Sequence, residues 1–174
     1  GIIIWNNAPV AYLLNLRSFE LWNSTKPFAG IFIPKKNIKP ILITNHLNLK
    51  KVSKINKSFH IFKEEKFIKY LKSSKLKNIE TSYEFLNLNM YMRLSNFLNV
   101  SETKINISKY MGIKTSKEIK NIESCHIEDG LAVLKFIIEL KQKKINPKNE
   151  YDVSEILYNK RKEGINFFRN SFDY

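Results

Sequence analysis

Short apolar runs separated by polar segments fill the first half of the chain, and this pattern predicts alternating strands and helices. Ile2 to Trp5 is a β-branched run that predicts a strand, and the Asn-Ala-Pro segment after it predicts a short helix over Val10 to Asn15. Phe28 to Pro34 and Pro40 to Thr44 flank a polar loop, which predicts an antiparallel hairpin. Because both runs are strongly apolar, we expect both strands to be central in a sheet.

The alternation continues to about residue 108. We expect a short helix over His46 to Ile55, a strand over Phe59 to Phe62 and a helix over Glu64 to Lys72. Lys104 to Ser108 is polar or β-branched and is predicted as a last edge strand.

Thr81 and Glu84 have the spacing of a capping box, which satisfies two free amides at a helix start. They therefore predict a helix that runs to about Leu94. Its inward side chains are expected to be Phe85, Leu88 and Met92.

Two long helices are predicted after residue 112. Thr115 and Glu118 form a second capping box, so the first of these helices should run from Ser116 to about Lys143. Pro147 cannot continue a helix, and the second is expected from Asp152 to about Phe168.

The first long helix has one apolar face. Four residues recur at spacings of four, three and four, so the pattern predicts a core helix whose face packs on another element. These residues are Ile127, Leu131, Leu134 and Ile138.

The order of elements predicts the fold class. Strands alternating with helices over the first 110 residues are typical of a three-layer α/β domain with a mixed sheet. Because two long helices replace this pattern near Gly112, we expect one domain over residues 1–112 and a second, helical segment over 113–174.

Composition sets limits on the class of protein. The chain has 174 residues, 43% of them hydrophobic, so it should bury a core rather than remain disordered. Its longest apolar runs are far shorter than the roughly 20 residues of a membrane-spanning helix, so we expect no membrane crossing. Cys125 is the single cysteine, which excludes an intramolecular disulfide and fits a cytoplasmic location. The start at Gly1 shows no signal-peptide pattern and is expected to lie inside a longer protein.

A formal net charge of +14 raises the question of a nucleic-acid partner. Nucleic-acid readers rely on Arg for bidentate and stacking contacts, but only four of the 30 basic residues here are Arg. The lysines are scattered along the whole chain among many Asn and Ile residues. We interpret the charge as a compositional bias and expect no specific nucleic-acid partner.

Three ordered motifs carry a family resemblance. Val10 to Glu20 reads V-A-Y-L-L-N-L-R-S-F-E, Ser124 to Phe136 reads S-C-H-I-E-D-G-L-A-V-L-K-F, and a third segment runs from Glu150 to Phe172. Each resembles a segment of the Xaa-Pro aminopeptidase (aminopeptidase P) family, within the creatinase/prolidase-like metallopeptidases. The resemblance covers most of the chain at low identity, and its order matches the family's order.

Several positions depart from the family's pattern. Ser18 stands where the family usually has Gly, so the freedom of a Gly to adopt positive φ is absent there. Glu128 replaces a usual Arg or Lys, which argues against any role that a cation at this position would have. Tyr12, Glu20 and Cys125 are milder replacements of Trp, Asp and Ala.

The resemblance implies what each part of the chain does. Residues 1–112 would form a creatinase N-terminal-like domain, and residues 113–174 the first helices of a truncated pita-bread peptidase domain. The parent enzyme would release the N-terminal residue of peptides that have proline at the second position, using two divalent ions, manganese or zinc. The family's metal ligands, two Asp, one His and two Glu, match nothing here, so we expect them beyond Tyr174 and expect this fragment to be inactive. Homodimer formation stays open.

The residues themselves show no other catalytic site. His46, His60 and His126 lack the spacing of metal ligands, so a structural or surface role is favoured for each. Cys125 points about 100° away from His126 on a helix, which argues against a Cys–His nucleophile pair.

Arg17 is the candidate substrate-binding residue. Its guanidinium follows an apolar run, and in the resembling family this N-L-R segment lies in the domain that caps the catalytic cleft. It could hold a substrate or interdomain carboxylate bidentately. A structural ion pair or an exposed cation is the alternative. Asn15, in the same motif, is predicted to be a turn or cap residue.

Two other functional classes stay open. The charge alone would suit a basic nucleic-acid-binding or ribosome-associated module with steep salt dependence. A peptidase-like fold that binds peptides without cleaving them is the third hypothesis.

Overall fold

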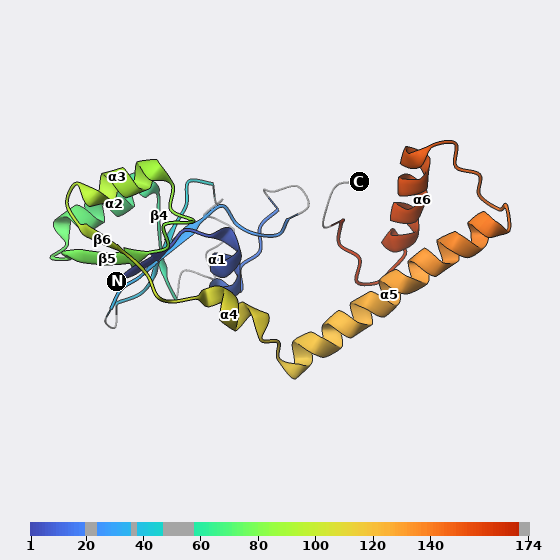
Figure 1. Cartoon of the computed structure of the whole chain (residues 1–174), viewed down its shortest axis with the longest axis horizontal. Helices are drawn as coiled ribbons and strands as arrows, with labels where there is room; N and C mark the ends of the chain where they lie inside the picture. Colours follow the sequence, from blue (N-terminus) through green and yellow to red (C-terminus); the bar gives the residue numbers. More distant parts are fainter. Residues whose placement is uncertain (20–23, 36–37, 47–57, 171–174) are drawn as a thin grey trace. The chain divides into compact units, whose positions relative to one another are not determined.

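The computed structural model describes residues 1–19, 24–35, 38–46 and 58–170. The chain divides into two compact units, Gly1–Met111 and Gly112–Tyr174. Figure 1 shows that strands are confined to the first unit, while the second consists of helices and connecting segments.

Six strands of the described residues form one mixed sheet with the order β4-β3-β2-β1-β5-β6. β2 is antiparallel to both of its neighbours, and the other three pairings are parallel, so β2 alone runs in the reverse direction. The bounds are β1 Ile2–Ile4, β2 Gly30–Ile33, β3 Ile41–Ile43, β4 His60–Phe62, β5 Asn78–Thr81 and β6 Asn99–Glu102.

The side chains of the central strands alternate between two separate cores. Phe32, Ile41 and Ile43 are buried in one cluster of apolar residues. Ile31 and Leu42, their neighbours in sequence, are buried in a different cluster. Both faces of the sheet are therefore covered, which explains why these strands read as continuous apolar runs.

Helices cover the two faces. α1, Asn7–Leu14, contributes Val10 to the core that holds Ile31 and Leu42. α2, Glu64–Ser73, and α3, Leu88–Ser95, contribute Phe67 and Leu94 to the other core. The fold is thus three layers, helix, sheet and helices, as the sequence predicts.

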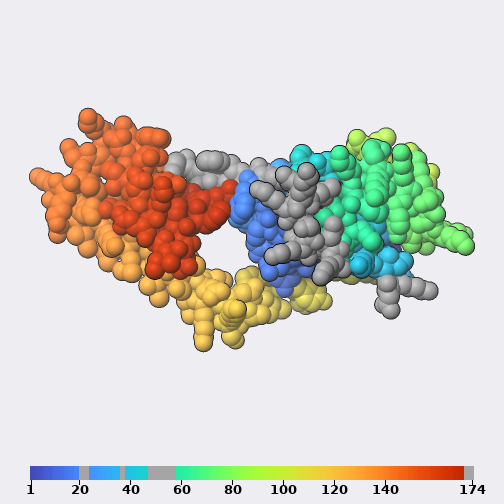
Figure 2. All heavy atoms as spheres, turned by 180° about the vertical axis from the view of Figure 1, so that it is seen from behind, coloured from blue at the N-terminus to red at the C-terminus, as the bar shows by residue number. Residues whose placement is uncertain are grey.

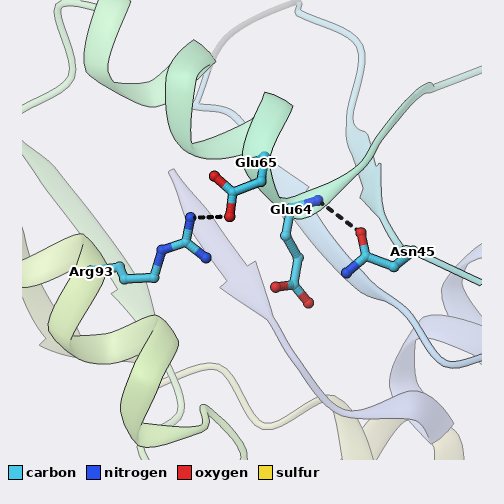
Figure 3. A network of polar contacts seen from close by, with 4 residues as sticks. All are labelled: Asn45, Glu64, Glu65 and Arg93. Atoms are coloured by element: carbon cyan, nitrogen blue, oxygen red, sulfur yellow. Dashed lines mark hydrogen bonds and ion pairs between the residues drawn. The ribbon is translucent and has the colours of Figure 1, made fainter.

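Polar contacts at the N-terminal end of α2 join it to its neighbours (Figure 3). The N-cap Lys63 has no side-chain cap, and Asn45 Oδ1 accepts from the Glu64 N–H at 3.3 Å. Arg93 of α3 donates to Glu65 Oε1 of α2 at 2.7 Å. The first contact joins α2 to the segment after β3, and the second joins α2 to α3. The exposed ion pair itself contributes little stability.

The predicted helix start at Thr81 is wrong, whereas the predicted end near Leu94 agrees with α3, Leu88–Ser95. Thr81 is the last residue of β5, fully buried between β1 and β6, and β5 was missed by the sequence pattern. The cap of α3 is Asn87, whose side chain accepts from the Met90 N–H at 2.8 Å. Because the helix starts later, its buried side chains differ from those predicted. They are Met90 and Leu94, and Leu86 is buried just before the helix, whereas Phe85, Leu88 and Met92 are exposed.

The predicted strand over Lys104 to Ser108 is also wrong. The edge strand is β6, immediately before it, and Ile107–Gly112 forms the short helix α4. Asn106 Oδ1 accepts from the Lys109 N–H at 3.2 Å, so this segment begins a helical turn. The helix predicted over His46 to Ile55 lies mostly outside the described residues.

The second unit contains α5, Ser116–Lys141, and α6, Glu150–Lys162. The predicted capping box at Thr115 and Glu118 is present. α6 packs against α5 (Figure 2), and Ala132 and Phe136 of α5 are buried. The predicted core face of α5 is exposed, so the expectation that it packs on another element is not met in this unit. Its residues Ile127, Leu131, Leu134 and Ile138 are 43% to 64% exposed.

Candidate functional site

Arg17 lies directly after the end of α1. Asn15 closes the helix in the left-handed conformation with φ of 46°, as expected of a cap residue. The Leu16 N–H then donates to the Ala11 carbonyl at 3.0 Å, which turns the chain back across the helix end. This turn directs the Arg17 side chain onto the last turn of α1.

The Arg17 guanidinium is held by backbone carbonyl groups. Its Nη1 donates to the carbonyl oxygens of Ala11 at 3.1 Å and of Leu16 at 3.0 Å. A cation at a helix C-terminus interacts favourably with the partial negative charge there. The side chain as a whole is exposed, and Nε and Nη2 carry three further N–H groups with the geometry for a carboxylate.

The rest of the motif is also structurally explained. Ser18 is buried, and its N–H donates to the Thr25 carbonyl at 2.9 Å. Ser18 is not among the described residues with positive φ, so the Gly that the family usually has is not needed here. Tyr12 lies on the exposed side of α1 and donates its hydroxyl to the Tyr110 carbonyl at 3.5 Å.

The remaining candidates do not converge on a site. His46, His60, His126 and Cys125 are all exposed. Within the described ranges no group of three or more His, Cys, Asp or Glu residues could hold a metal ion. None of the helices in those ranges combines the length and the apolarity that a bilayer crossing needs.

A groove of about 510 Å³ lies between α5 on one side and the end of α6 with the segment after it on the other. Asp129 receives two hydrogen bonds from Arg161, at 2.6 and 3.2 Å. Glu128 Oε1 accepts from Asn166 Nδ2 at 2.8 Å, so the acidic residue that replaces the family's usual cation joins α5 to the chain after α6. These contacts join parts of the second unit, and they assign no chemistry to the groove.

Curated relatives match the chain, some over nearly its whole length and others over 42% of it. A probable Xaa-Pro aminopeptidase P of Ajellomyces capsulatus is 27% identical over 99% of this chain. One of Sordaria macrospora is 24% identical over 94% of it. A third, of Paracoccidioides brasiliensis, reaches 35% identity over 77 residues. No protein-family model matches the chain.

The chain is related to the Xaa-Pro aminopeptidases. It spans 29% and 30% of the length of the Sordaria and Ajellomyces relatives. The resemblance inferred from the three sequence motifs is therefore confirmed by relatives that carry this name.

Solved structures of the same group share the fold. The X-prolyl aminopeptidase of Caenorhabditis elegans, described as a cytosolic enzyme with a di-nuclear active site, matches 99% of this chain with a TM-score of 0.80 at 15% identity. The chain covers 30% of that protein. An Xaa-Pro dipeptidase from Bacillus anthracis matches 93% of this chain and 44% of its own with a TM-score of 0.66 at 19% identity.

Proposed function

We propose that this chain is part of a longer Xaa-Pro aminopeptidase, which releases the N-terminal residue of peptides that have proline in second position. The observation that carries the proposal is that nearly the whole chain matches a segment of relatives with that name, and this segment is about 30% of their length. The shared fold across 99% of the chain supports the same group of enzymes.

In this proposal the two units belong to different domains of the parent enzyme. Residues 1–112 form the creatinase N-terminal-like domain, and residues 113–174 are the first helices of the pita-bread peptidase domain. The division at Met111 and Gly112 and the change from a sheet to helices support this assignment. The cytoplasm remains the proposed location.

The proposed enzyme uses two divalent ions, manganese or zinc, but the described residues of this chain do not fit a metal pair. The Asp129 carboxylate accepts from Arg161, and Asp152 Oδ2 accepts from the Lys148 N–H at 2.9 Å, so both carboxylates are used within the second unit. We therefore assign the metal ligands to other parts of the parent protein, and the chain by itself is proposed to be inactive.

Arg17 is the proposed contact for a substrate carboxylate or an interdomain carboxylate. Its two bonds to backbone carbonyls hold Nη1 in place. A guanidinium held in this way loses little further side-chain entropy when Nε and Nη2 bind a carboxylate.

The coding sequence downstream of residue 174 tests the proposal. It is expected to encode the ligand order Asp, Asp, His, Glu, Glu. The full-length product, with manganese or zinc, is expected to cleave Xaa-Pro peptides, whereas residues 1–174 alone should show no turnover above a tag-only control.

Two results would separate the alternatives. A downstream frame without these ligands would contradict an active peptidase, and peptide binding without turnover would then favour the non-catalytic module. Turnover by residues 1–174 alone would contradict the assignment of the metal site to other parts of the protein.

A further inference from the structure

Two residues of β6 direct their backbone N–H and C=O groups to the outer edge of the sheet, where these groups do not pair with β5. β6 is the last strand in the order that the described residues form. Asn99 and Thr103 donate their N–H groups to backbone oxygens on the β5 side, at 2.8 and 2.9 Å. Because the N–H and C=O of one residue point to the same side of a strand and successive residues alternate, those of Val100 and Glu102 point away from β5.

Tyr83 lies across this edge. Its hydroxyl donates to the Val100 carbonyl oxygen at 3.0 Å, and its backbone N–H donates to Glu102 Oε2 at 2.8 Å. Its ring packs edge-on against Tyr91 of α3, with 5.7 Å between the ring centroids. The phenol is therefore held by one hydrogen bond and one ring contact, and the backbone of the same residue by a second hydrogen bond, although Tyr83 is 48% exposed.

An edge strand with unpaired peptide groups is a template for another strand, and proteins protect such edges. β6 reads Asn-Val-Ser-Glu and contains neither Lys nor Pro, which are common protecting residues. A pairing strand would lie about 4.8 Å from β6, in the space where the Tyr83 hydroxyl meets the Val100 carbonyl. Tyr83 thus occupies both the acceptor and the space that a new strand would need.

We propose that Tyr83 guards the edge of β6 and prevents this strand from pairing with β6 of a second copy of the chain. A second copy related by a two-fold axis presents the same two outward peptide groups. Antiparallel pairing of two β6 edges would therefore satisfy these groups in both copies at once. The hydrogen bond from Tyr83 competes directly with that pairing.

Sedimentation velocity over a range of concentrations tests this proposal with the 174-residue chain. Tyr83→Ala removes the hydroxyl and the ring, so self-association should tighten by about tenfold or more, which corresponds to about 1.4 kcal/mol. Tyr91→Ala removes the ring that packs on Tyr83 but leaves the bond to Val100, and it should associate like the unmodified chain.

A second substitution shows whether association uses the β6 edge. Glu102→Pro removes an outward N–H group that the β5–β6 ladder does not use, and Pro is tolerated at such edge positions. It also removes the carboxylate that accepts from the N–H of residue 83, so Glu102→Ala, which removes only the carboxylate, is its matched control. In the Tyr83→Ala background Glu102→Pro should return self-association to the level of the unmodified chain. This substitution separates the β6 edge from the exposed apolar face of α5.

Unchanged association in Tyr83→Ala, or association that Glu102→Pro does not suppress, would overturn the proposal. Circular dichroism establishes that each variant is folded. If Tyr83→Ala does not fold, Tyr83→Phe replaces it, because this variant keeps the ring and loses only the hydroxyl. This variant should still self-associate more tightly than the unmodified chain. Self-association equal to that of the unmodified chain would contradict the proposed role of the Tyr83 hydroxyl.

Discussion

At the scale of single residues, Arg17 is the proposed carboxylate contact and also a cation bonded to the end of α1. The sequence motif points to a substrate contact, and the structure shows bonds from Nη1 to the carbonyls of Ala11 and Leu16. The side chain is exposed, which agrees with the alternative of an exposed cation, and the carboxylate contact stays a prediction. The contribution of Arg17 to stability should be that of a helix-end cation bonded to fixed carbonyl groups.

Arg17→Ala should therefore lower the free energy of unfolding by about 1–2 kcal/mol, because charge-assisted bonds and a helix-dipole interaction are lost. Arg93→Ala is the matched control, since its guanidinium bonds to an exposed carboxylate, and it should cost only ~0.5 kcal/mol. Urea denaturation measures both. Equal costs would show that the carbonyl contacts of Arg17 add nothing.

At the scale of elements, the start of α5 depends on a reciprocal cap. Glu118 Oε2 accepts from the Thr115 N–H and from its hydroxyl, both at 2.7 Å. The Glu118 N–H in turn donates to Thr115 Oγ1 at 3.3 Å. The bond from the Thr115 backbone, followed by that from its side chain, lowers the pKa of Glu118 below its ordinary value.

This lowered pKa predicts a pH dependence of the helix start. The carboxylate stabilises the folded cap above the pKa of Glu118 in the unfolded chain, and that contribution is lost as pH falls through the lower folded pKa. The protection of the first-turn amides of α5, measured as their exchange rate relative to the intrinsic rate at each pH, should therefore fall in that acidic window. Glu118→Gln keeps a capping side chain without a charge, and it should remove this pH-dependent step. A step of equal size in the variant would assign the effect to another carboxylate.

At the scale of the whole chain, the two units differ in how much core they bury. Both apolar clusters of the first unit consist of residues up to Val100. In the described part of the second unit only Ala132 and Phe136 are buried hydrophobic residues. The first unit therefore has a core of its own, whereas the second depends on one helix pair and its polar bonds.

Residues 1–111 should unfold cooperatively without the second unit. Their melting temperature should stay within about 4 °C of the first transition of the 174-residue chain, since about 1 kcal/mol produces a shift of that size. Residues 112–174 alone should melt without a cooperative transition. Calorimetry on both pieces measures this, and an unfolded 1–111 piece would show that its core does not suffice.

Much of the fold could be predicted from local sequence. The apolar runs of β1, β2 and β3 predict strands because a buried strand needs side chains that fit both faces of a sheet. The capping box of α5 was predicted because its partners are only three residues apart. The family resemblance likewise rests on short motifs, and the relatives confirm it.

Other features were decided only by tertiary structure. Asn78–Thr81 is too short and too polar to predict a strand, and it becomes β5 because β1 and β6 bond to it on both sides. The same pairing takes Thr81 out of a capping-box pattern that sequence alone favoured. The role of Tyr83 at the β6 edge also appears only when Val100, seventeen residues away, is brought beside it. Local patterns determine which segments prefer a strand or a helix. The partners of their polar groups depend on contacts between distant residues, which form only in the folded sheet.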